Sequence, residues 1–92
     1  MIAIHYPKLK HIEDFLAFMA KVESAAHGSP GMLRFGSWRE DGGKRLVGLS
    51  MWESKEFFEA SLPHIMSLHE ERNAEWSERP DDVLFLAEPW SS

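Results

Sequence analysis

The stretch RLVGLSMWESKEFFEAS, Arg45–Ser61, decides the fold, because it joins a strand to a helix within two residues. Its first half is a mainly apolar run that predicts a strand over 45–52. Ser54 is a good N-cap, so a helix is expected to begin at Lys55. Pro63 lacks a backbone N–H and is expected to kink or restart that helix.

The rest of the chain divides into similar elements. EDGG, residues 40–43, predicts a hairpin, since Asp and Gly tolerate positive φ. Apolar residues at three- and four-residue spacing over 12–26 predict a helix, which the breaker run HGSPG ends. The strands that we expect are 1–6, 32–40, 45–52 and 83–87.

The predicted order is β-α-β-β-α-β, which indicates an α+β chain with a ferredoxin-like fold. This fold has a four-stranded antiparallel sheet with both helices on one face. No linker or internal repeat interrupts residues 1–92, so a single domain is expected.

The predicted strands are apolar on both faces. Val47, Leu49 and Met51 alternate with Leu46 and Trp52, although two helices can cover only one face of the sheet. The second face is therefore predicted to pack on another copy of the chain, as a homodimer.

Composition excludes several classes of function. The net charge of −5 argues against nucleic acid and anionic membranes as partners. The absence of cysteine excludes disulfides, thiolate nucleophiles and cysteine-based zinc sites. No apolar run approaches the roughly 20 residues that span a bilayer, and MIAIHYPKLK has no features of a signal peptide. A cytoplasmic location is therefore expected.

Two short motifs carry a resemblance to a known family. Pro30-Gly31 leads into the second strand, and Trp52-Glu53-Ser54 ends the third. In this order the chain resembles the antibiotic biosynthesis monooxygenase (ABM) domain family, which are dimeric α+β barrels. The resemblance implies cofactor-independent oxidation of quinol or polyketide-like aromatics, or haem degradation.

The chain departs from this family at the positions that bear on chemistry. Many relatives carry a histidine nine residues after the tryptophan, where this sequence has Ser61. Haem-degrading relatives share an asparagine, a tryptophan and a histidine, of which only the last has a match, His69.

Three histidines are the candidate catalytic residues. His5 is expected to point between sheet and helices, as a base or as a satisfied core or interface histidine. His64 and His69 lie on the second helix, and each is either a cavity residue or a surface histidine. Their five-residue spacing does not chelate one metal ion, and no metal site is predicted.

Aromatic and apolar residues are the candidates for substrate binding. Trp52 either stacks on a flat aromatic ligand or closes the end of the sheet as a core anchor. The same choice between pocket and core or interface applies to Tyr6, Phe57, Phe58 and Met66.

Three functions follow from these observations. The first is O₂-dependent oxidation of a small aromatic in a pocket between sheet and helices, without flavin or metal. The second is a haem-binding or haem-degrading protein, with His69 or His64 as the axial ligand. The third is a non-catalytic dimeric domain that binds a small molecule.

Overall fold

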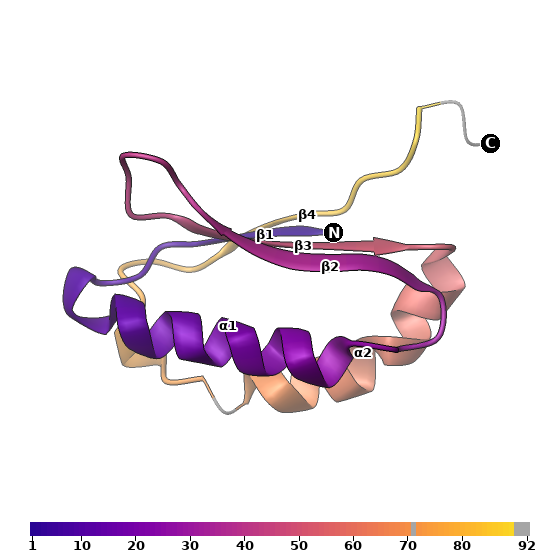
Figure 1. Cartoon of the computed structure of the whole chain (residues 1–92), viewed down its shortest axis with the longest axis horizontal. Helices are drawn as coiled ribbons and strands as arrows, with labels where there is room; N and C mark the ends of the chain where they lie inside the picture. The colour runs from indigo at the N-terminus through magenta and orange to yellow at the C-terminus, as the bar shows by residue number, and fades with distance from the viewer. Residues whose placement is uncertain (71, 90–92) are drawn as a thin grey trace.

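The computed structural model describes residues 1–70 and 72–89. Its elements follow the predicted order (Figure 1). They are β1 (Ile2–His5), η1 (Leu9–His11), α1 (Ile12–Ala26), β2 (Met32–Arg39), β3 (Leu46–Trp52), α2 (Lys55–His69), η2 (Ala74–Trp76) and β4 (Asp82–Leu84).

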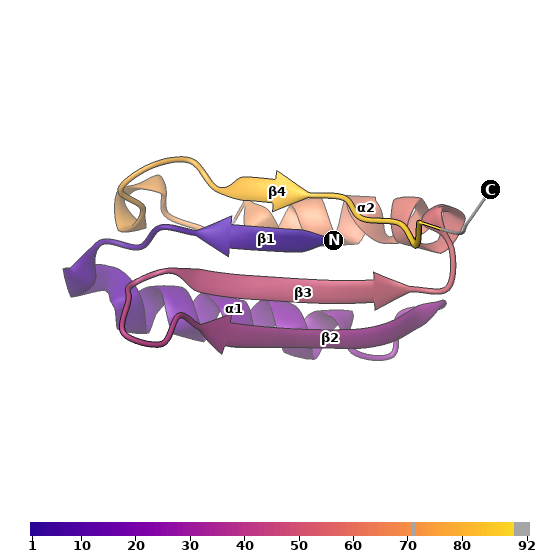
Figure 2. The same cartoon turned by 90° about the horizontal axis from the view of Figure 1, so that it is seen from above.

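The four strands form one antiparallel sheet in the order β2-β3-β1-β4. Both helices lie under the same face of this sheet, and the other face is uncovered (Figure 1). Seen from above, α1 runs beneath β2 and β3, whereas α2 runs near β4 and β1 (Figure 2). The predicted ferredoxin-like fold is confirmed.

Helix α1 has the bounds that its apolar spacing predicts, and its apolar stripe faces the sheet. Phe15 and Leu46 are both 0% exposed and form the centre of the core with Met19. The buried residues of α1 are Ile12, Phe15, Phe18, Met19, Val22 and Ala26.

Helix α2 begins as predicted, because the Ser54 hydroxyl accepts a hydrogen bond from the Phe57 N–H at 3.3 Å. It does not restart at Pro63, which lies inside one continuous helix. The ribbon of α2 bends along its course (Figure 1), as expected of a helix that lacks one backbone hydrogen bond.

One strand prediction needs correction. β4 ends at Leu84 rather than Ala87, because Leu84 already pairs with Ile2, the first residue of β1. The register of β2 against β3 shifts between Met32 and Arg34, as at a β-bulge.

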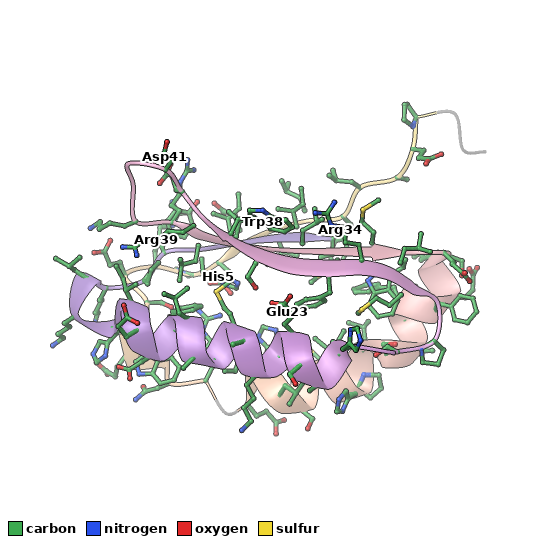
Figure 3. All side chains as sticks on the ribbon, viewed as in Figure 1. His5, Glu23, Arg34, Trp38, Arg39 and Asp41 are labelled. Atoms are coloured by element: carbon green, nitrogen blue, oxygen red, sulfur yellow. The ribbon has the colours of Figure 1, made fainter. Side chains whose placement is uncertain are left out.

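The uncovered face of the sheet is rich in apolar side chains. Trp38, Met51 and Leu84 are 45–48% exposed, and Figure 3 places Trp38 and Arg34 on this side. The predicted apolar character of both faces is thus observed. No helix within residues 1–70 and 72–89 has the length and hydropathy needed to cross a bilayer.

Candidate functional site

A small cavity lies between the sheet and the helices. Its volume is about 50 Å³, and its walls are mostly apolar. The residues that line it are Met1, Ala3, His5, Phe18, Met19, Val22, Phe35, Ser37, Gly48, Leu49, Ser50, Ile65 and His69. The cavity thus brings together two of the three candidate histidines, which are 64 positions apart in the sequence.

His5 reaches this cavity from β1, where strand alternation turns Ala3 and His5 inward. Figure 3 shows His5 on the helix side of the sheet, where His5 is only 5% exposed. Its ring lies 4.9 Å from that of Phe15. A Cβ built on Gly48 would be 3.9 Å from Nε2, so this nitrogen faces the small residues of β3.

The other ring nitrogen of His5 faces a carboxylate. Nδ1 of His5 lies 3.0 Å from an Oδ of Asp81, the residue just before β4. Arg72 donates to both oxygens of Asp81, at 2.5 and 2.9 Å. It also donates to the Ser77 hydroxyl at 2.7 Å, and its guanidinium lies over the Phe15 ring. His5, Asp81 and Arg72 therefore form one largely buried polar cluster.

This cluster keeps Asp81 ionised. Burial alone would raise the pKa of Asp81, but the contacts with His5 and Arg72 hold it well below its usual range. The Asp81 carboxylate approaches the Nδ1 side of His5 at 3.0 Å without hydrogen-bond geometry, whereas Nε2 lies on the side of Gly48, which lines the cavity.

His69 forms another part of the wall, from the last turn of α2. It is half-buried, and its ring meets Phe18 edge-on with centroids 5.8 Å apart. Burial, together with the charge of Arg72, lowers the pKa of His69 below its ordinary value, so the ring is neutral at pH 7. His64 is exposed and does not line the cavity.

His69 also borders an open hollow of about 460 Å³ at the surface. The residues that line this hollow are His69, Arg72, Ala74, Ser77, Arg79 and Pro80. His69 therefore lines both spaces.

The residues predicted to bind substrate lie outside the cavity. Tyr6 donates a hydrogen bond to Asp82, which raises the pKa of Tyr6. Trp52 packs edge-on against Phe58 at 5.7 Å, in keeping with the core-anchor interpretation. Phe57 and Met66 are 39% and 58% exposed. Helical spacing does not settle which face of α2 turns toward the sheet, and only Ile65 is fully buried there.

Sequence reasoning missed three residues of this site: Arg72, Asp81 and Ser50. Asp81 lies in the polar run SERPDD, residues 77–82, which by its composition predicts only a break between helix and strand. Arg72 lies five residues before this run. The available signal for Ser50 is the alternation of Leu46, Gly48 and Ser50, which places a hydroxyl on the covered face. Among the described residues, no group of three or more His, Asp or Glu could hold a metal ion.

Comparisons with known proteins identify the fold. No family's sequence model matches the chain, and no curated protein matches it. A candidate antibiotic biosynthesis monooxygenase from Nitrosomonas europaea is 16% identical, with a TM-score of 0.84 over 97% of this chain and 96% of that one. Another solved antibiotic biosynthesis monooxygenase is 18% identical, with a TM-score of 0.78 over 96% of each chain.

A third solved structure is the heme-degrader MhuD from Mycobacterium tuberculosis. It is 23% identical, with a TM-score of 0.67 over 90% of this chain and 89% of that chain. At these identities the similarity is one of fold. The chain therefore has the ferredoxin-like fold of antibiotic biosynthesis monooxygenase proteins, as the sequence resemblance predicts.

Proposed function

We propose that this chain binds a small phenolic or polyketide-like aromatic between the sheet and the helices, and oxidises it with O₂ without flavin or metal. One observation supports this proposal above the others: His5 and His69 line the same apolar cavity, with Asp81 beside Nδ1 of His5. A buried base oriented by a carboxylate is the group that proton abstraction requires.

The proposed reaction begins with proton transfer from the substrate to Nε2 of His5. Asp81 lies close enough to stabilise the imidazolium that forms. The substrate anion then gives one electron to O₂, and the two radicals combine into a peroxide. For an activated ring CH₂, the peroxide loses water and leaves a carbonyl, so that CH₂ and O₂ become C=O and H₂O. His69, neutral at pH 7, offers a hydrogen bond to the substrate oxygen.

The size of the cavity sets how a ring would enter. A volume of 50 Å³ corresponds to only a few water positions, at roughly 10–15 Å³ each. A phenolic ring therefore needs His69 to move toward the open hollow that it borders. A haem is far larger than the inner cavity, and the residues present do not fit it there, so we derive no step through haem.

The proposal includes a homodimer formed through the uncovered face of the sheet. That face exposes Trp38, Met51 and Leu84, and it carries a hollow of about 510 Å³ next to Arg34 and Arg39. Burying such apolar side chains against a second copy removes them from water. Sedimentation equilibrium should give twice the 10.6 kDa chain mass; a mass near 10.6 kDa would contradict the dimer.

Oxygen uptake with a quinol and with anthrone tests the activity. We expect His5→Ala to slow uptake by roughly 10²–10⁴-fold, the range for loss of a general base. His69→Ala should slow it less. His64→Ala is the matched control, because His64 lies on the same helix but outside the cavity, and it should leave the rate unchanged.

Three experimental outcomes would contradict this proposal, and the last two would each favour one of the other two functions. Equal uptake by the His5→Ala and His64→Ala variants would exclude catalysis by His5. Uptake by the wild-type chain no faster than without protein would favour the non-catalytic binding domain. A Soret band at stoichiometric hemin that His69→Ala abolishes would favour the haem-binding alternative, although the inner cavity does not fit it.

A further inference from the structure

Ser50 is a buried polar residue that the proposed chemistry does not use. It is 3% exposed, and within residues 1–70 and 72–89 its hydroxyl has no hydrogen-bond partner. Its backbone is satisfied, because its N–H donates to the Met1 carbonyl and its carbonyl accepts from the Met1 ammonium. Buried hydroxyls are nearly always paired, so the open Ser50 hydroxyl calls for an explanation.

The other serine of the cavity is different. The Ser37 hydroxyl donates to Glu23 at 3.4 Å, and Figure 3 shows Glu23 between α1 and the sheet. Ser37 is therefore held by the fold, whereas Ser50 is not. Both line the same cavity, and so only Ser50 has a hydroxyl left for a molecule within it.

The register of the sheet sets the distance between Ser50 and His5. On the inward face of β3, Ser50 lies two residues beyond Gly48, which is about 6.7 Å along the strand. Nε2 of His5 lies near Gly48. His5 and Ser50 therefore reach the cavity at different points along β3, His5 near Gly48 and Ser50 one strand repeat further on.

We propose that Ser50 is the second polar anchor of the ligand, and that its hydroxyl hydrogen-bonds an oxygen on the edge of the ring opposite the one that meets His5. This inference rests on the proposed pocket. The ligand class that it names is a ring with oxygens at opposite positions. Gly48 keeps the space between the two anchors open, since any side chain there would enter it.

The role of Ser50 is tested by comparing the binding of two probes to the wild-type chain and to Ser50→Ala. The probes are 1,4-dihydroxybenzene and 4-methylphenol, which differ in the group opposite the first hydroxyl, and binding is measured by NMR titration. The wild-type chain should bind the diol roughly 3- to 10-fold more tightly, the range for one hydrogen bond. Ser50→Ala should abolish this preference and leave 4-methylphenol binding unchanged.

Two further variants serve as controls. Ser24→Ala removes an exposed serine of α1 and should keep the preference for the diol. Gly48→Ala places a methyl group in the cavity, at ordinary contact distance from His5, and should weaken both probes alike.

Thermal unfolding separates a ligand anchor from a structural serine. Because its hydroxyl is unpaired in the fold, Ser50→Ala should leave Tm unchanged or raise it by several degrees. Three results would overturn the anchor but not the pocket. They are a lower Tm for Ser50→Ala, a diol preference that survives in Ser50→Ala, and the absence of that preference from the wild type. Failure of both probes to bind the wild-type chain would overturn the pocket, and the anchor with it.

Discussion

Asp81→Asn tests the polar cluster on which the proposed base depends. The side chains of Arg72 and Asp81 are only 14% and 16% exposed, and the substitution leaves Arg72 charged and buried without its anion. Removing one partner of a buried ion pair costs about 3–5 kcal/mol. Asparagine has nearly the size of aspartate and keeps one acceptor oxygen, so we expect a loss at the lower end of this range, about 3 kcal/mol. For a domain of this size that lowers Tm by roughly 12 °C or more.

Urea unfolding followed by tryptophan fluorescence at pH 7 measures this loss, with Asp82→Asn as the matched control. The Asp82 side chain is 47% exposed, and its 3.4 Å pair with Arg79 lies at the surface. An asparagine at 82 keeps an oxygen that can accept the hydrogen bond from Tyr6. Such pairs contribute about 0–1 kcal/mol. Equal losses for the two variants would refute the reasoning, because burial is the property that distinguishes the two aspartates.

The pH dependence gives the same test a second readout. The folded-state pKa of Asp81 lies below its unfolded value of about 3.9, so its contribution is complete above that pH. The contribution is lost as the pH falls further and the carboxylate takes up a proton. The difference in unfolding free energy between wild type and Asp81→Asn should therefore shrink between about pH 4 and pH 2. A difference that stays constant over this range would contradict the assignment.

Three further predictions concern stability. The pKa of His69 is lowered in the folded chain, so wild type should lose stability as the pH falls through about 6.5, and His69→Gln should flatten that slope in urea unfolding from pH 7 to 5. Leu46→Ala empties a fully buried site and should cost about 2–5 kcal/mol by urea unfolding; a cost below 1 kcal/mol would contradict its place in the core. Ser54→Ala removes the cap of α2 and should cost about 1 kcal/mol, visible as reduced helical circular dichroism near Tm.

The sequence predicts the architecture well where local patterns are strong. Helix α1 carries six buried residues on one stripe, and its predicted and observed bounds agree. The end of β4 was not predictable from its own residues, because Phe85 and Leu86 are as apolar as the strand before them. What ends the strand is the length of β1, its partner, which begins at Ile2.

The candidate site could be predicted only in part. His5 and His69 were identified by residue type, and strand alternation placed His5 inward. Arg72 and Asp81 come together with His5 only once β4 pairs beside β1, which no local pattern encodes. Phe57 and Met66 were predicted to line the pocket from their residue type, but both are exposed, because α2 buries little of its apolar surface.

The most direct test of the proposed pocket is where a bound phenol lies. Intermolecular NOEs between 4-methylphenol and the methyl groups of the ¹³C-labelled chain measure this. The proposed site predicts contacts to Ala3, Val22 and Ile65, which line the cavity beside His5. Contacts only to Ile4 and Val47, which line the hollow on the uncovered face, would contradict it.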